Sequence, residues 1–264
     1  MHDSIADLSL SPSERQQWQD HGYFIRHQQF AQTELLQLRR AAAKAAARAE
    51  GGARLGHTYF LDDKRFVDVE DATIQYEHAP GSTTLRVLEP VHLFHEQIDR
   101  LVDDPRLAQP MRELVGADSL SLWTAKLNMK SAAGSGFGWH QDSPYWIHDC
   151  AHVDQLPNVM LALDAQSPAN GCLRIIRGSH KLGILPGTAD GTQLGGFYTD
   201  PAAYSLEDEE AMHVEAGALI FLHSLSVHGS QPNTSEHSRR ALIFTYLPGD
   251  FPMLKNGEVR NVQI

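Results

Sequence analysis

The sequence predicts a mostly β protein with flanking helices, an α+β arrangement in which helices buttress a jelly-roll barrel. The first third of the chain carries helix signals, whereas after Ser119 short apolar runs alternate with turn residues. The 264 residues, 42% of them hydrophobic, can form one large core without a disulfide framework. We expect one domain over residues 1–264, with 1–10 as a loose tail, 11–116 as a mainly helical buttress and 117–250 as the β core.

Four helices are predicted in the first part of the chain from their start and stop signals. Ser11-Pro12-Ser13-Glu14 is a capping box with proline at the first helical position, and this helix should end near Gly22. A short strand, Tyr23-Phe24-Ile25, should follow it. The second helix is rich in alanine and should end at Gly51-Gly52, and the last should end at Gly116. The predicted helices span residues 12–20, 34–50, 90–102 and 105–115.

Short runs with strand character follow Ser119, separated by turns such as Asn170-Gly171 and Ala216-Gly217. The predicted strands are residues 120–130, 159–163, 172–176, 218–222 and 241–247. Residues 53–85, by contrast, show no clear period. Within them, residues 54–81 resemble either a loop that covers a substrate or an ordinary surface loop.

Charge and composition argue against several classes of partner. The net charge of −11 disfavours nucleic acid and anionic membranes, and no apolar run approaches the roughly 18 residues of a membrane span. Two cysteines, Cys150 and Cys172, are too few for a disulfide framework, and the first residues show no signal-peptide pattern. We therefore expect a cytoplasmic protein that acts on a small molecule. The oligomeric state is not readable from the sequence.

The stretch Gly136–Trp146 contains the strongest candidate for a metal site. His140 and Asp142 stand two residues apart, so both side chains point to the same side of an extended segment. With 15 histidines in the chain such pairs also arise by chance, as at His152-Val153-Asp154 and His213-Val214-Glu215. The pair at 140 and 142 differs in having a loose run before it and aromatic side chains around it that could wall off a pocket, namely Ser131–Gly136, Trp139, Tyr145 and Trp146.

A third ligand can come from His228, with His223 and His237 as competitors. In a continuous strand His223 would face away from His228, and His237 lies in a polar turn. Two histidines and one carboxylate form the facial triad of non-haem Fe(II) oxygenases, which leaves three coordination positions open. The residues alone favour His228 without deciding the matter.

A cation suited to a carboxylate ligand follows eleven residues after His228, at Arg239. Arg239 and Arg240 are adjacent, so one should point into the barrel and the other should be a surface charge. The spacing favours Arg239 as the inward residue. Ser230 has the same parity as His228 and can point into the same pocket, or it is a hydroxyl in a turn.

Four ordered motifs resemble the phytanoyl-CoA dioxygenase family over about residues 20–246. They are His140-Gln141-Asp142, Asn170-Gly171-Cys172-Leu173, Gly178-Ser179-His180-Lys181, and His228-Gly229-Ser230 followed by Asn233, Ser235 and Arg239. Members of this family are Fe(II)- and 2-oxoglutarate-dependent oxygenases built on a double-stranded β-helix, a cupin-like jelly roll. The resemblance implies that fold and that chemistry here.

By this resemblance, His140, Asp142 and His228 are the expected iron ligands. Arg239, assisted by Ser230, is the expected clamp on the distal carboxylate of 2-oxoglutarate. With O2 as the other cosubstrate, the expected outcome is hydroxylation, or another oxidation, of a substrate C–H bond with release of succinate and CO2. Related halogenases lack the carboxylate that Asp142 supplies, so its presence favours oxidation without halogenation.

Four further positions are less settled. Lys126 and Arg86 fall at positions similar to cosubstrate-lining residues of the family, although Lys126 could be an ordinary outward lysine and Arg86 could pair with Glu89. Two residues depart from the family pattern. Arg177 stands where members often have proline before Gly-Ser-His, and Met160 stands where an aromatic side chain often lies near the cosubstrate.

Two other classes of function stay open. One is a non-catalytic cupin-type barrel that binds zinc or another ligand, which would need a closed fourth ligand and no cosubstrate anchor. The other is a metal hydrolase, which needs a general base, and none is evident near Trp139 or Trp146. The substrate itself, whether an acyl-CoA thioester, an amino acid, a phosphonate or a secondary metabolite, is not readable.

Overall fold

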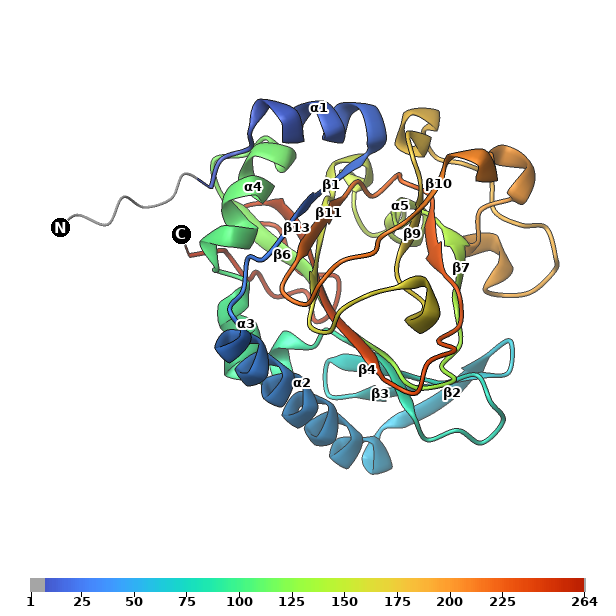
Figure 1. The fold of residues 1–264 in the computed structure, drawn as a ribbon. Helices are drawn as coiled ribbons and strands as arrows, with labels where there is room; N and C mark the ends of the chain where they lie inside the picture. The colour runs from blue at the N-terminus through green and yellow to red at the C-terminus, as the bar shows by residue number, and fades with distance from the viewer. Residues whose placement is uncertain (1–7, 264) are drawn as a thin grey trace.

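The computed structural model describes residues 8–263, and its framework is two antiparallel sheets (Figure 1). The nine-stranded sheet contains, in spatial order, β1 (Tyr23–Arg26), β11 (Leu219–Leu222), β8 (Asn158–Ala162), β13 (Arg239–Pro248), β6 (Leu120–Lys130), β5 (Leu85–Glu89), β4 (Ala72–Tyr76), β3 (Lys64–Val69) and β2 (His57–Leu61). The four-stranded sheet contains β10 (Glu209–Ala211), β9 (Arg174–Ile176), β12 (His228–Ser230) and β7 (Phe137–His140). This is the jelly roll with flanking helices that the sequence predicts.

Helices lie outside the large sheet, and Figure 1 shows α1 to α4 on one side with the small sheet on the other. The α-helices are α1 (Pro12–His21), α2 (Gln32–Gly52), α3 (Glu96–Leu101), α4 (Pro105–Val115) and α5 (Ser143–Trp146). Short 3-10 turns are η1 (Ala53–Leu55), η2 (His92–Phe94), η3 (Val153–Gln155), η4 (Pro168–Asn170), η5 (Ser179–Leu182), η6 (Gly195–Phe197), η7 (Pro201–Ala203) and η8 (Leu206–Asp208). No helix within residues 8–263 is long and apolar enough to cross a membrane.

The ends of α1 follow the predicted signals. Ser11 and Glu14 form the capping box, and Gly22 ends the helix with a φ of 81°, a conformation that glycine adopts without strain. Residues 1–7 of the expected loose tail lie outside the described part of the chain. Leu10 is buried, and the carbonyl of Leu8 accepts a hydrogen bond from Arg26.

The structure corrects two predictions about the first half of the chain. The helix predicted over residues 90–102 is divided into η2 and α3, because His95 has an extended backbone and its ring accepts a hydrogen bond from the N–H of Gln97. Residues 54–81, expected to be loops, form β2, β3 and β4. The β2–β3 hairpin turns at Asp62 and Asp63, both with positive φ, so the glycine that usually marks such a turn is missing.

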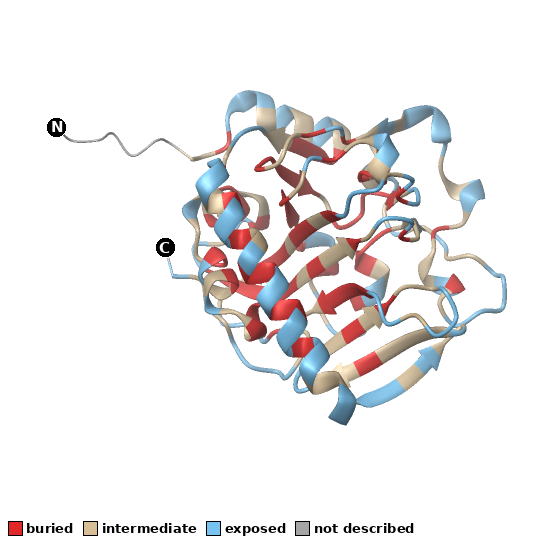
Figure 2. Cartoon of the chain, turned by 60° about the horizontal axis from the view of Figure 1, so that its bottom comes forward, coloured by how far each residue is buried: buried red, intermediate tan, exposed pale blue. Residues whose placement is uncertain are grey.

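Alternation along the strands separates two cores. Leu242 and Phe244 of β13 face the helices and belong to the larger apolar cluster, together with the inner stripe of α2, which Figure 2 shows as a buried band. Ala241 of β13 faces the interior between the two sheets, with Ile243 packed beside it. Before the register shift at Thr245, a side chain of β13 with the parity of Ala241, such as Arg239, therefore enters the barrel.

Candidate functional site

The two sheets bring His140, Asp142 and His228 together. His228 opens β12, and its backbone is paired with His140 at the end of β7. Asp142 follows two residues after His140, where β7 gives way to α5. One ligand atom from each of the three side chains lies within 4.8 Å of the other two. The cross-strand pairing of His140 with His228 thus brings two imidazoles together. Asp142, two residues after His140, adds the carboxylate.

Hydrogen bonds orient both rings toward a common point. Nδ1 of His140 lies 2.7 Å from the carbonyl of Gly138, and Nδ1 of His228 lies 3.0 Å from the carbonyl of Ser226. If each Nδ1 carries the proton, both Nε2 atoms are free to bind a metal. Asp142 is held in turn, because its Oδ2 accepts a hydrogen bond of 2.7 Å from the Asn158 amide.

The protonation states suit a metal ion. Burial, and then the neighbouring His228, lower the pKa of His140 to about 3, so its imidazole is neutral at physiological pH. Burial works against ionisation of Asp142, but His228, Lys126 and His140 outweigh it and lower the pKa of the carboxyl. Neutral imidazoles and an ionised carboxylate are the forms that bind divalent metals.

The competing histidines lie elsewhere. His223 follows the end of β11, and its ring lies 5.3 Å from those of Trp18 and His180. The continuous strand assumed for residues 223–228 is wrong, because β11 ends at Leu222 and β12 begins at His228. His237 is exposed in its turn, and His152 packs against Phe251.

Arg239 enters the barrel and Arg240 does not, as the strand alternation predicts. Arg239 is 2% exposed and lines the same cavity as the three candidate ligands. It donates one hydrogen bond of 3.1 Å to Gln166, while its Nε has no partner within the described residues. Burial lowers its pKa to about 10, so it stays charged at neutral pH. Arg240 instead pairs with Asp164 at 2.8 Å.

Lys130 is a site residue that the sequence reasoning missed. It is paired with Arg239 in the register of β6 and β13, and its side chain is 2% exposed. Its ammonium donates to the Ser230 hydroxyl at 2.6 Å, the Gln231 carbonyl at 2.6 Å and the Gly171 carbonyl at 3.2 Å. Strand alternation places residues 126, 128 and 130 on one face, but it does not show whether that face is buried at Lys130.

Ser230 is consequently fixed as a hydrogen-bond donor. Its oxygen accepts from Lys130 and also, at 3.3 Å, from the backbone N–H of Phe137. A hydroxyl has two lone pairs and one hydrogen, so the hydrogen is left to donate to another group. Ser230 lines the cavity beside Arg239, so its hydrogen can reach an acceptor there.

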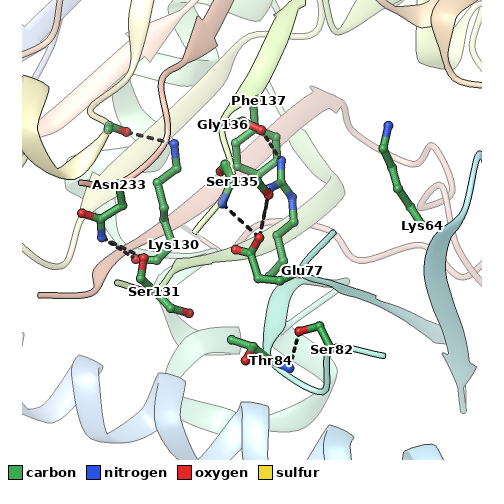
Figure 3. Close-up of polar contacts among 12 residues, drawn as sticks. Lys64, Glu77, Ser82, Thr84, Lys130, Ser131, Ser135, Gly136, Phe137 and Asn233 are labelled. Atoms are coloured by element: carbon green, nitrogen blue, oxygen red, sulfur yellow. Dashed lines mark hydrogen bonds and ion pairs between the residues drawn. The ribbon is translucent and has the colours of Figure 1, made fainter. Parts of the chain in front are cut away.

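Arg86 lies in a strand and not before a helix, and its ionic partner is Glu77 at 3.6 Å, not Glu89. The register of β4 and β5 shifts at this point, so Arg86 and Val87 both line the cavity. The guanidinium donates to the carbonyls of Ser135 at 3.1 Å and Gly136 at 2.8 Å, while Glu77 accepts from Ser135 (Figure 3). These contacts fasten the loop before β7 that was expected to be flexible.

Lys126 faces the other end of the cavity. Its ammonium lies 3.9 Å from Glu89 and 5.2 Å from the centre of the Trp146 ring. Burial lowers its pKa, but Glu89 and Asp142 have the larger combined effect, so the net shift is upward and the group is charged. The expectation that Lys126 lines the cosubstrate stays a prediction.

The cavity has a volume of about 350 Å³. Tyr145, Trp146 and Tyr198 are among its walls, whereas Trp139, expected to be one, points toward Tyr204. Met160 does line the cavity. Arg177, the other departure from the family pattern, uses its backbone N–H in a hydrogen bond to the carbonyl of Asp208 that proline could not make.

Comparison with known proteins agrees with this geometry. The profile of the phytanoyl-CoA dioxygenase family matches residues 18–241. A probable alpha-ketoglutarate-dependent hypophosphite dioxygenase from Stutzerimonas stutzeri is 30% identical over 71% of this chain and 67% of its own length. An L-proline trans-4-hydroxylase from Streptomyces griseoviridis is 30% identical over 77% of this chain and 85% of its own.

A solved structure shares the fold. The apoform of EctD from S. alaskensis superposes with a TM-score of 0.70 and 22% identity, over 90% of this chain and 77% of that chain. At this identity the superposition supports the fold alone, whereas the family profile covers residues 18–241 and all three candidate ligands. The chain belongs to the phytanoyl-CoA dioxygenase family and is an Fe(II)- and 2-oxoglutarate-dependent dioxygenase.

Proposed function

We propose that His140, Asp142 and His228 bind Fe(II), that Arg239 and Ser230 bind the distal carboxylate of 2-oxoglutarate, and that the enzyme hydroxylates a C–H bond of a small metabolite. The observation that carries this proposal is the meeting, in one cavity, of three converging ligand atoms and a buried arginine with an unpartnered Nε. A facial triad without an anion anchor would fit many metals. The anchor singles out a carboxylate cosubstrate.

The residues present fit both groups. Two imidazoles and a carboxylate suit Fe(II), and His140, Asp142 and His228 would hold it. On the cosubstrate side, Arg86 and Arg239 are buried cations, Lys130 is a buried base whose pKa is lowered to about 7, and Glu77 is the nearby carboxylate. Buried charges need counter-charges, so this end of the cavity favours an anion.

When bound, iron supplies the redox chemistry by which 2-oxoglutarate, O2 and R–H become succinate, CO2 and R–OH. The protein's own residues position the reactants. Asn158 holds Asp142, and the carbonyls of Gly138 and Ser226 hold the two imidazoles. Arg239 offers a planar, permanently charged donor and Ser230 a directed hydroxyl, so together they fix the far end of the cosubstrate. The aromatic walls keep bulk water from the reacting C–H bond.

A small substrate is supported by the size of the cavity. Its volume of about 350 Å³ lies at the low end of ligand sites and must hold the cosubstrate as well. The two relatives described above are named for hypophosphite and L-proline, which are both small and polar.

We place the enzyme in the cytoplasm, since Cys150 and Cys172 are unpaired.

An anaerobic titration tests this function. Fe(II) and 2-oxoglutarate together should give a weak visible charge-transfer band at roughly 500 nm, as open-sided triads of this kind allow. Zn(II) in place of Fe(II) is the matched control and should give no band. Absence of the band with Fe(II), together with no succinate formation in air, would favour the non-catalytic barrel.

A further inference from the structure

We propose that the substrate is a small zwitterion whose ammonium and carboxylate groups share one carbon, as in an α-amino acid, and that Glu89 and Lys126 bind these two groups. The inference rests on the proposed function, because it concerns the substrate end of the same cavity. Lys126 and Glu89 both line that cavity. Leu88 is paired with Leu127, so the next residues along the two strands, Glu89 and Lys126, are cross-strand neighbours on the inner face.

This pair is remote from the cosubstrate anchor. Arg239 is paired with Lys130, and Lys126 lies four residues away on the same strand. At about 3.3 Å per residue, the two rows are about 13 Å apart. On the inner face of β6, Lys126 is therefore two positions away from Lys130, the partner of Arg239. Its side chain extends toward Trp146 and Asp142.

The two charges are incompletely satisfied by the protein. Among residues 8–263 the Lys126 ammonium makes no hydrogen bond, since its 3.9 Å contact with Glu89 is too long for one. Glu89 accepts a hydrogen bond of 2.7 Å from Thr124 on Oε1, while its Oε2 has no partner in the described chain. Their side chains are 22% and 23% exposed, so both remain accessible from the cavity.

The chemistry of this arrangement selects a ligand with both signs of charge. The ammonium and carboxylate of an α-amino acid lie about 3 Å apart, since they share one carbon, and this matches the 3.9 Å between the two side chains. Its ammonium can bind Glu89 while its carboxylate binds Lys126. A ligand with a single charge would satisfy one side chain and be repelled by the other. Tyr145 and Trp146 then face the carbon skeleton.

The first experiment is a screen of matched compounds with the Fe(II)-loaded 264-residue chain. Each α-amino acid, including L-proline, is compared with its amide, which keeps only the positive charge, and its N-acetyl form, which keeps only the negative charge. Succinate above the uncoupled background is measured in air. Anaerobic binding is measured by perturbation of the charge-transfer band. We expect responses from free amino acids, with at least tenfold weaker binding of both blocked forms of a responding compound.

The second experiment assigns the residues. Glu89→Gln and Lys126→Met should each raise KM for the responding amino acid at least tenfold and leave the Kd for 2-oxoglutarate within threefold. Met keeps the aliphatic stem over Trp146, and an unchanged band would show that the variant is folded. Glu96→Gln and Arg100→Met, which remove an exposed ion pair of 3.2 Å on α3, are the matched controls and should change neither constant.

Three outcomes would overturn the proposal. One is that a singly charged or neutral form is the best substrate, and another is that no free amino acid perturbs the band. The third is that Lys126→Met weakens 2-oxoglutarate as much as Arg239→Ala does, which would return Lys126 to the cosubstrate site. A missing band together with no succinate formation in the unmodified enzyme is a different result, because it refutes the proposed function itself.

Discussion

The two sheets contribute to the cavity in different ways. The small sheet supplies His140 and His228 from one hydrogen-bonded pair, and Asp142 follows within two residues. The large sheet supplies its polar side chains from several strands, among them Arg239 and Lys126. A metal site needs only a local step and one strand pair, whereas the wall opposite depends on the register of a nine-stranded sheet. The metal site is therefore easier to predict from the sequence than the polar residues of the large sheet. Those residues are also freer to vary.

The two walls also differ in charge. The metal wall, formed by His140, Asp142 and His228, carries one ionised carboxylate, whose charge the metal would compensate, and the imidazole of His140 is neutral. The large sheet instead carries an excess of buried cations near Arg239 and an open ion pair near Lys126. Loss of a metal ligand should abolish the reaction, whereas loss of a large-sheet residue should weaken one ligand at a time.

The largest effect is expected at the metal wall. His228→Ala should abolish coupled turnover and reduce bound iron, because two protein ligands are left. His223→Ala should keep most activity, since that ring packs against Trp18 and His180. Succinate formation and iron stoichiometry measure both. If His223→Ala lost iron and His228→Ala kept it, the assignment of the third ligand would be wrong.

A smaller and more selective effect is expected at Arg239. Loss of one partner from a desolvated charged pair costs about 2–5 kcal/mol, so Arg239→Ala should weaken 2-oxoglutarate about 30-fold or more. Iron affinity should hardly change, because the arginine is not a ligand. Anaerobic titration of the charge-transfer band gives the Kd, and metal analysis gives the iron content. If Arg239→Ala lost iron as strongly as it lost 2-oxoglutarate, the cosubstrate anchor and the metal ligands would not act independently.

Sequence reasoning succeeded where the determinants are local. The parity of Arg239 and Arg240 followed from strand alternation, and the structure buries one and pairs the other with Asp164. Helix α1 followed from its capping box. The third histidine was not decided by the residues themselves. It needed the family resemblance, because the pairing of His228 with His140 joins segments 88 residues apart.

Long-range pairing explains what was missed. Strands β2 to β4 escaped notice because their hairpin turn has aspartates with positive φ in place of glycine. Arg86 was assigned the wrong partner because a register shift, invisible in the sequence, turns it toward Glu77. Lys130 was missed because an ordinary strand lysine looks the same whether it is buried or exposed. Only its neighbours Arg239 and Ser230 give it a role.

A pH dependence should distinguish the basic side chains of the large sheet, Arg239 and Lys130, from the metal wall. Burial, and then Arg239 and Arg86, lower the pKa of Lys130 to about 7. A bound carboxylate favours the charged ammonium and raises this pKa, so binding takes up a proton above pH 7. Affinity for 2-oxoglutarate should thus fall as pH rises from 7 to 9, by at most about tenfold per unit. Anaerobic Kd values at several pH values measure it.

The variant Lys130→Met is the control for that profile. It removes the titrating group. The Kd for 2-oxoglutarate should therefore change little between pH 7 and 9, even if overall affinity is lower. Protonation of the metal ligands would act in the opposite direction, since it weakens binding as pH falls. A flat profile in the unmodified enzyme would mean that Lys130 keeps its proton throughout and only orients Ser230.

The smallest effect is expected at Arg240, the neighbour of the anchor. Its guanidinium bonds to Asp164 at 2.8 and 2.9 Å, on the face of β13 away from the cavity. Arg39 also pairs with Asp164 at 3.0 Å, so Arg240→Ala would not leave the carboxylate alone. Partly exposed ion pairs contribute about 0.2–1 kcal/mol, and urea unfolding should show a loss of that size. The Kd for 2-oxoglutarate should stay within threefold. An effect equal to that of Arg239→Ala would mean that the strand register is shifted by one residue.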